Sequence, residues 1–116
     1  MTTIRPKLGL KPTPADADPV PLLTDAIATR RAIEAVYNRD TIRLAPHVLY
    51  RRDDTLFLDG VVMQRNGAPP REAKLGAFRL TGLTRLRMAP DSFAPIATFD
   101  PAEERYGDNV VAIVTR

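Results

Sequence analysis

The sequence predicts an α+β, mostly-β domain: a small, strongly bent sheet or barrel of about five strands preceded by one helix. The chain has 116 residues, of which 44% are hydrophobic, and this suits one small globular domain. One segment near the N-terminus has apolar residues at helical spacing, and beyond it apolar and polar residues mostly alternate, as in half-buried strands. Gly82 interrupts one alternating segment, and small barrels need such bends to close.

The composition predicts a flexible, proline-rich tail at residues 1–18 and a single domain at residues 19–116. The tail has Arg5, Lys7 and Lys11 but no apolar run after them, so it does not resemble a secretory signal. No segment approaches the roughly 20 apolar residues that a membrane helix needs. The sequence has no cysteine, which permits a reducing compartment, and we expect a cytoplasmic protein of bacterial type with no membrane partner.

A helix is predicted near residues 21–31, with Asp18 or Thr24 as its N-cap. Alternation then favours a hairpin with strands near 32–38 and 41–50, although the helix could also extend through the first of these segments. The hairpin is the preferred interpretation because a polar turn separates the two alternating runs.

The rest of the domain is predicted to contain mainly strands. Residues 55–63 are β-branched and aromatic, and residues 64–74 form a loop rich in glycine and proline. Residues 76–88 are expected to form one long strand that bends at its internal glycine. Residues 100–103 have an aspartate, a proline and a glutamate spaced as at the start of a compact helix. Residues 109–115 form a continuous apolar run, which predicts a buried strand.

Charge is distributed unevenly although the formal net charge is only +3. Residues 30–52 carry six arginines against two acidic residues, and residues 65–87 carry six basic residues against one acidic residue. Residues 88–109 carry five acidic residues against one arginine. These blocks could form a basic face for an anionic partner. We prefer the alternative that the acidic segment folds back and neutralises the basic ones, because a small domain cannot separate its charges far.

Three arginines, Arg79, Arg85 and Arg87, fall on odd positions of the segment 76–88, so a single strand would place them on one face. An arginine beside a groove can bind phosphate or carboxylate through two parallel hydrogen bonds. It can equally cover apolar surface with its methylene groups and leave its charge in water. The two interpretations are balanced for Arg79, and the solvated one is preferred for Arg85 and Arg87.

Arg43 and His47 share one parity of the strand predicted at 41–50. If that strand lay beside residues 76–88, Arg43 and Arg79 would converge on one anion-binding cup. His47 is the only histidine, and we prefer a hydrogen-bonded structural role for it over catalysis, because no nucleophile or orienting acid accompanies it.

No motif supplies a metal or cofactor site. The chain lacks cysteine, and Asp53-Asp54 is interpreted as a turn without a third hard ligand nearby. Asp59 lies in an apolar strand, where an unpaired carboxylate is costly, so we expect a salt bridge to an arginine. We therefore expect no catalytic residue, no metal and no cofactor.

Aromatic residues could stack a nucleobase, as they do on small barrels that bind single strands. The candidates are Tyr37, Phe57 and Phe78. Alternation places Phe78 on the apolar face, so a core position is preferred for it. Phe57 shares its parity with Asp59, which favours an exposed or groove-lining position.

Two stretches, LAPHVLYRRDDTLFLDGVV and GAFRLTGLTRL, resemble the WYL domain, a small Sm-like β-barrel of bacterial regulators. The resemblance rests on the proline-containing segment 46–49, on Leu-Phe-Leu at 56–58 in place of Trp-Tyr-Leu, and on 78–83 in place of Phe-Arg-Leu-Asp-Arg-Ile. Thr81 and Gly82 depart from that last motif. The resemblance covers roughly residues 22–95 and implies an Sm-like barrel. It also implies a regulatory module that senses a ligand or binds nucleic acid through basic strand residues.

The leading expectation is a non-enzymatic regulatory module that binds an anionic ligand, either a nucleotide or a short single strand of nucleic acid. The expected ligand-binding residues are Arg79 and Arg43, followed by Arg85, Arg87 and His47, with Tyr37 and Phe57 as stacking candidates. The alternative is a protein-interaction or homo-oligomeric assembly module, with a regulatory protein or a second copy as the partner, in which the apolar segment 109–115 adds to a neighbour's sheet as an edge strand.

Overall fold

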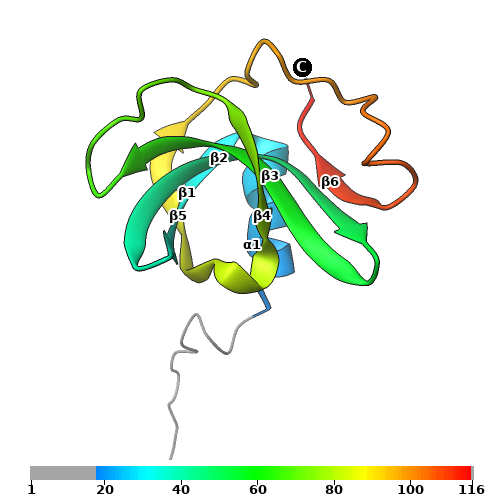
Figure 1. Ribbon diagram of the computed structural model, residues 1–116, viewed down its shortest axis with the longest axis horizontal. Coiled ribbons are helices and arrows are strands. Elements are labelled where there is room, and N and C mark those ends of the chain that lie inside the picture. Colours follow the sequence, from blue (N-terminus) through cyan, green and yellow to red (C-terminus); the bar gives the residue numbers. More distant parts are fainter. Residues whose placement is uncertain (1–17, 116) are drawn as a thin grey trace, which may run out of the picture.

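The computed structural model describes residues 18–115, so the expected tail, except for Asp18, lies outside the described residues (Figure 1). The described part contains one α-helix, one short 3-10 helix and six strands. In chain order these are α1 (Pro19–Thr29), β1 (Arg31–Tyr37), β2 (Asp40–Arg52), β3 (Thr55–Arg65), β4 (Leu75–Arg79), η1 (Leu80–Gly82), β5 (Thr84–Ser92) and β6 (Val110–Ile113).

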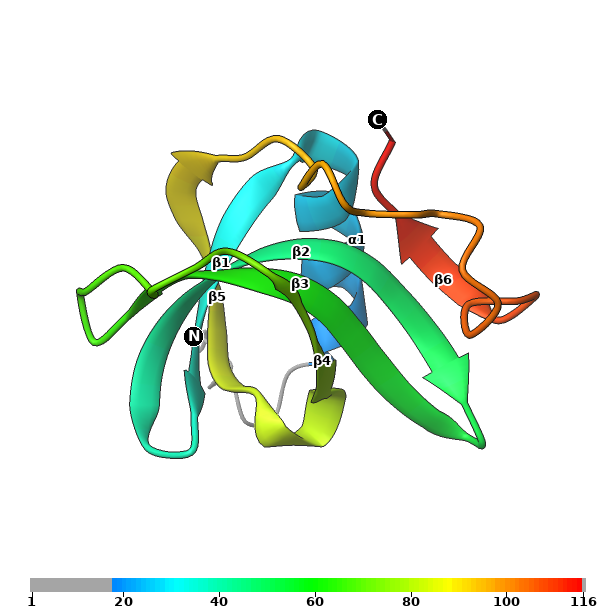
Figure 2. The ribbon, with the colours of Figure 1, turned by 45° about the horizontal axis from the view of Figure 1, so that its top comes forward.

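The six strands form one antiparallel sheet in the order β4-β3-β2-β1-β5, with β6 paired to β2. The strand β2 is long enough for its first half to pair with β1 and its second half with β6 (Figures 1 and 2). The sheet curves strongly, but within residues 18–115 no strand pairing joins β4 to β5. The expected mostly-β class with one preceding helix is confirmed, whereas the sheet is open rather than a closed barrel.

Local sequence explains the helix and the first two hairpins. Asp18 caps α1 by accepting a hydrogen bond from the Val20 amide at 3.0 Å, so of the two N-caps considered the structure uses Asp18. Each of the first two hairpins turns on two residues with positive φ, which is the geometry of a type I′ turn. These residues are Asn38 (φ 50°), Arg39 (φ 70°), Asp53 (φ 50°) and Asp54 (φ 65°).

A bulge divides β2. The pairing with β3 shifts between Pro46 and Val48, so His47 is an extra residue with no partner in the register. Because an extra residue reverses the alternation, the parity of the first half of β2 does not continue into the second half. We call the face that carries Leu44, Leu58 and Phe78 the inner face, and the opposite one the outer face.

Inner-face residues form the main core with the buried side of α1. The core includes Leu23 and Ile27 of the helix together with Leu49, Leu58 and Phe78 of the sheet. The ring of Tyr37, on β1, meets the edge of Phe78, on β4, with ring centroids 5.2 Å apart. This contact joins strands near opposite ends of the sheet order, so it helps to hold the curvature, and Phe78 is a core residue as expected.

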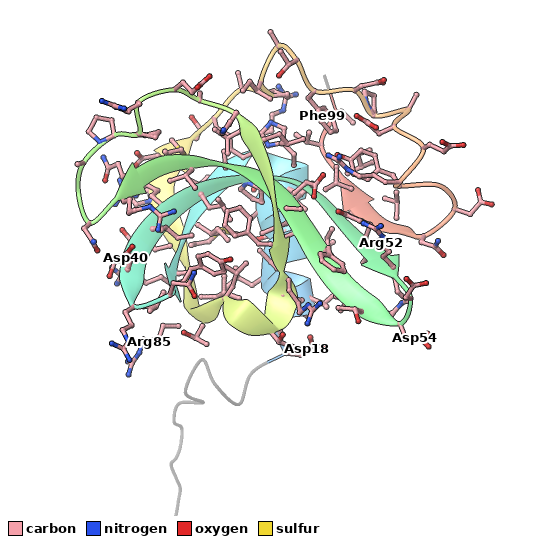
Figure 3. The ribbon with its side chains drawn as sticks, in the orientation of Figure 1. Asp18, Asp40, Arg52, Asp54, Arg85 and Phe99 are labelled. Carbon is pink, nitrogen blue, oxygen red and sulfur yellow. The ribbon has the colours of Figure 1, made fainter. Side chains whose placement is uncertain are left out.

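The outer face is partly covered by the segment 93–109, which we call the strap. The strap connects β5 to β6 and carries Phe99 and Tyr106, both buried against the sheet. Figure 3 labels Phe99 at the top of the molecule, where the strap crosses. A hydrogen bond also holds the start of the strap in place: the Phe93 amide donates to the Arg30 carbonyl at 3.0 Å.

Three predicted elements differ from the structure. The segment 76–88, expected to be one strand, contains two strands, β4 and β5, which η1 separates. They lie on opposite edges of the sheet although the alternating pattern continues through both. Residues 100–103 form hydrogen-bonded turns instead of a compact helix: Asp100 accepts from the Ala102 amide at 2.9 Å, but the chain does not continue helically. The segment 109–115 yields only a short edge strand, β6, and Val111 on it is 42% exposed, so the strand is not buried.

Within residues 18–115 no helix is long and apolar enough to cross a membrane.

Candidate functional site

Arg79 and Phe57 form a cross-strand pair on the outer face. They are direct partners in the register between β4 and β3. The guanidinium carbon of Arg79 lies 5.9 Å from the centroid of the Phe57 ring, within the range of a cation–π contact. The Phe57 ring in turn stacks on Tyr50, with centroids 5.9 Å apart and an interplanar angle of 21°. Arginine and aromatic ring therefore present a common surface.

Arg52 lies on the same face. It is two residues beyond Tyr50 on β2, and alternation places both side chains on one side of the strand. Burial, above all, raises the pKa of the Tyr50 hydroxyl to about 12, and the positive charge of Arg52 acts in the opposite direction. We call the surface formed by Arg52, Phe57 and Arg79 the Phe57 platform.

Neither arginine of the platform is neutralised. The ion pairs in the described part of the chain engage Arg43, Arg65, Arg87 and Arg105, but not Arg52 or Arg79. Both platform arginines are exposed, whereas Phe57 is half-buried. The platform thus offers two uncommitted guanidinium groups beside an accessible ring.

Arg43 and Arg87 are committed to ion pairs. The Arg43 guanidinium lies 2.6 Å from Glu34 and 3.1 Å from Asp91, and Arg87 binds the other oxygen of Glu34 at 2.5 Å. Hydrogen bonds, first from Arg43 and then from Arg87, hold the pKa of Glu34 below its usual value. Asp91 belongs to the acidic segment 88–109, so this contact agrees with the preferred interpretation that acidic residues fold back onto basic ones.

Arg43 and Arg79 do not form a common cup. The register aligns Arg79, through Phe57, with Tyr50 on β2, seven residues beyond Arg43. At about 3.3 Å per residue this is roughly 20 Å along the strand. The expectation of a shared cup was wrong because it required residues 76–88 to lie as one strand beside residues 41–50.

Arg85 also separates from Arg79. It lies on β5, in a bulge where its φ is 54°, and its side chain extends into solvent away from the sheet (Figure 3). The expectation that Arg79, Arg85 and Arg87 share a face therefore fails, because η1 separates Arg79 from the other two. Tyr37 points to the interior beside Phe78, away from the Phe57 platform.

His47 is a buried structural residue. Its side chain is fully buried, and it stacks on Phe93 and meets Phe99 edge-on, with centroids 5.3 and 5.2 Å away. Nδ1 lies 2.8 Å from the Ala45 carbonyl, which can only accept, and Nε2 accepts from the Ile96 amide at 3.0 Å. These contacts fix the neutral tautomer. The expected role of His47 as a ligand contact does not fit this burial, which is imposed by the bulge in β2.

We expect His47 to make stability depend on pH between 7 and 5. Burial lowers its pKa below 6.5, so the unfolded chain binds a proton at a higher pH than the folded chain does. The free energy of unfolding should then fall as the pH falls below about 6.5, by at most about 1.4 kcal/mol per pH unit for one proton. Urea unfolding of the wild type and of His47→Gln, at several pH values, measures this.

The glutamine variant should give a flatter profile in that window. Glu34 and Asp40 have pKa values below their usual ones, so they lose their contributions at lower pH and do not mimic the histidine. Identical slopes for the two proteins would show that His47 does not titrate as described.

Asp59 is the centre of a buried polar network beneath the strap. It is fully buried and accepts hydrogen bonds from Tyr50 at 2.8 Å, Tyr106 at 2.7 Å and Arg105 at 2.7 Å. Burial raises the pKa of Tyr106, and the hydrogen bond to Asp59 adds to this. The expected salt bridge of Asp59 is confirmed, with Arg105 as the partner. Three side chains donate hydrogen bonds to this fully buried carboxylate, so its role is structural.

Sequence reasoning did not single out Arg52 or Tyr106. Arg52 could have been found from its parity with Tyr50, next to the Asp53-Asp54 turn. Tyr106 could not, because its contact with Asp59 spans 47 positions of the chain. Within residues 18–115 no group of three or more His, Cys, Asp or Glu side chains is placed to hold a metal ion.

No family model matches this chain. A comparison with curated proteins gave no significant match, and neither did a comparison with solved structures.

Proposed function

We propose that this protein is a non-enzymatic regulatory module that binds a short single strand of nucleic acid on the Phe57 platform. The observation that carries the proposal is the position of the Arg79 guanidinium over the Phe57 ring, with no acidic partner for Arg79 or Arg52 among residues 18–115. Single-strand binders combine such positive charge, for the phosphates, with an aromatic ring on which a base stacks.

The resemblance to WYL domains supports the same surface. Its two motifs include Phe57 and Arg79, and the register pairs these two residues across adjacent strands. A helix followed by consecutive antiparallel strands in one strongly curved sheet supports an Sm-like arrangement as part of the proposal. A cytoplasmic location is part of the proposal, and the lack of cysteine in the sequence is compatible with a reducing compartment.

Replacing Arg79 by alanine should weaken binding of a short labelled single-stranded DNA by at least tenfold at moderate salt. The variant loses one charge-assisted phosphate contact and the cation that lies on the ring, and 1.4 kcal/mol corresponds to a factor of ten. Fluorescence anisotropy measures the dissociation constant. The matched control is Arg71→Ala, which removes one exposed charge from the loop between β3 and β4.

The control separates a site from general attraction. Loss in Arg79→Ala with little change in Arg71→Ala supports the platform. Equal small losses of affinity in both variants would mean that the DNA responds only to the overall charge of the protein. The assignment of the binding site to the Phe57 platform would then be wrong. If a mononucleotide displaces the labelled DNA, one base and its phosphate are sufficient for binding.

A second candidate function, assembly through an edge strand, is favoured by β6. In the described chain β6 pairs only with β2, and Val111 on it is the one large hydrophobic residue that is exposed. An unpaired edge with an exposed apolar side chain can accept a strand from a partner. Light scattering after size exclusion should then give a dimer that Val111→Lys returns to a monomer.

A further inference from the structure

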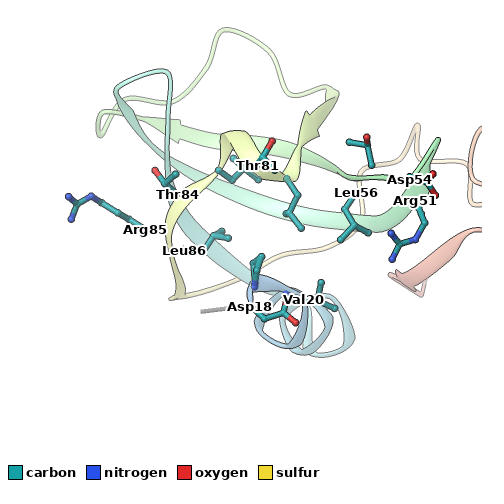
Figure 4. Close-up of a pocket in the computed structure, with 13 residues that line it drawn as sticks. Asp18, Val20, Arg51, Asp54, Leu56, Thr81, Thr84, Arg85 and Leu86 are labelled. Carbon is teal, nitrogen blue, oxygen red and sulfur yellow. The ribbon is translucent and has the colours of Figure 1, made fainter. Parts of the chain in front are cut away.

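A pocket of about 560 Å³ lies on the opposite side of the hairpin from the Phe57 platform. Figure 4 shows it between the N-terminus of α1, the tip of the β2–β3 hairpin and the chain that runs from η1 into β5. Its volume is within the range of pockets that bind small molecules. No residue of the platform lines it.

The wall of the pocket is mainly apolar. Its apolar lining residues are Val20, Leu56, Leu80, Leu83 and Leu86, with Pro19 at the helix start. Leu80 and Leu83 are buried, but Val20, Leu56 and Leu86 keep part of their surface exposed toward the pocket. The inner face of the open sheet is thus accessible at this end, and an apolar ligand would remove that surface from water.

Four charged residues line the pocket, Asp18, Arg51, Asp54 and Arg85, and they differ in their contacts and directions. Asp18 is engaged as the helix cap, through the hydrogen bond from the Val20 amide. Arg85 extends away from the pocket, whereas Arg51 extends from the hairpin toward the space between the sheet and α1 (Figure 4). Arg51 forms no ion pair in residues 18–115, and Asp54 at the same end forms none either.

We propose that this pocket binds small carboxylic acids with an apolar body, the carboxylate pairing with Arg51 and the body lying against the leucines. A guanidinium group matches a carboxylate with two parallel hydrogen bonds. A cationic ligand would be repelled by Arg51, and a neutral one would leave it unpaired. Asp54 beside it disfavours a second negative charge, so a monoanion fits this end of the pocket better than a dianion.

Binding of decanoate to the full-length protein, measured by isothermal titration calorimetry, tests the site. We expect decanoate to bind with saturation and decanol to bind more weakly. Arg51→Gln should weaken decanoate binding about tenfold, and Arg51→Glu should abolish it, while decanol is unaffected by Arg51→Gln. Both substitutions are at an exposed position, and thermal unfolding checks that the fold is intact.

Arg52→Gln is the matched control because it alters the adjacent arginine, which points to the other face. Arg52→Gln should leave decanoate binding unchanged and weaken the binding of single-stranded DNA. Arg51→Gln should weaken decanoate binding and leave the binding of single-stranded DNA unchanged. The two proposals can thus fail separately. The pocket proposal is overturned if the wild type does not bind decanoate, or if both arginine variants bind it equally. It is also overturned if decanoate binds only after residues 1–17 are removed, since the preceding chain would then be the occupant.

Discussion

Asp59→Ala is expected to lower the free energy of unfolding by about 3–5 kcal/mol. The change removes the common acceptor of Tyr50, Tyr106 and Arg105. The buried hydroxyl groups of Tyr50 and Tyr106 would lose the acceptor of the hydrogen bonds that they donate, and each unsatisfied donor costs about 1–3 kcal/mol. A small domain has only about 5–15 kcal/mol of stability, so the variant should unfold at much lower urea concentration.

Urea unfolding followed by circular dichroism measures this loss. Asp108→Ala is the control, because Asp108 is an exposed carboxylate at the end of the strap and forms no ion pair with any of residues 18–115. Asp59→Asn should lose less stability than the alanine variant, because the amide oxygen still accepts hydrogen bonds. A loss below about 1 kcal/mol for Asp59→Ala would contradict the burial and hydrogen bonding described for this network.

The second large effect is expected for Gly60→Ala, which should destabilise the fold by about 1–3 kcal/mol. A Cβ atom at Gly60 would lie 2.9 Å from the Ala45 carbonyl oxygen and 3.2 Å from Leu44. The first of these is a backbone atom in the neighbouring strand, so relief requires β2 and β3 to move apart. The close approach occurs beside the bulge at His47, where β2 bends.

The matched control for Gly60 is its partner in the register, Gly76 on β4. A Cβ atom there would lie 3.6 Å from the Phe78 ring and 4.0 Å from the Gly60 carbonyl oxygen, and both are ordinary contacts. Gly76→Ala should therefore change stability by less than about 1 kcal/mol, and could raise it by restricting the unfolded chain. Similar losses in the two variants would mean that the strands are not packed as described.

The helix and the two tight hairpins could be predicted because their signals are local. Asp18 and the apolar spacing that follows it define the start of α1, and the polar pairs Asn38-Arg39 and Asp53-Asp54 have the positive φ values of two-residue turns. Each of these features depends on residues that are adjacent in the chain.

The sheet edges could not be predicted in the same way. Residues 76–88 alternate with nearly constant parity, yet η1 sends the two halves to opposite edges, and alternation does not specify a strand's neighbours. The bulge at His47 reverses parity without a glycine to mark it. The faces of Arg43 and His47 therefore could not be derived from position alone.

The candidate site was predicted in part. Phe57 and Arg79 were both identified from the sequence, and the register makes them partners. Arg43 was a leading candidate and Arg87 a secondary one, but Glu34 pairs with both. This acid is recognisable as their partner only when β1 is known to lie between β2 and β5. Charge pairing across strands is a property of the assembled sheet.

The central claim is that the Phe57 platform binds phosphate-bearing single strands, and a salt series on the double variant Arg52→Ala/Arg79→Ala tests it most directly. For single strands, the logarithm of the binding constant falls with the logarithm of salt concentration by about 0.7 per phosphate contact. The double variant should therefore bind at least tenfold more weakly than Arg79→Ala alone, with a slope reduced by about 1.4 relative to the wild type. An unchanged affinity and slope would contradict the claim and place the contacts with nucleic acid, if any, elsewhere on the protein.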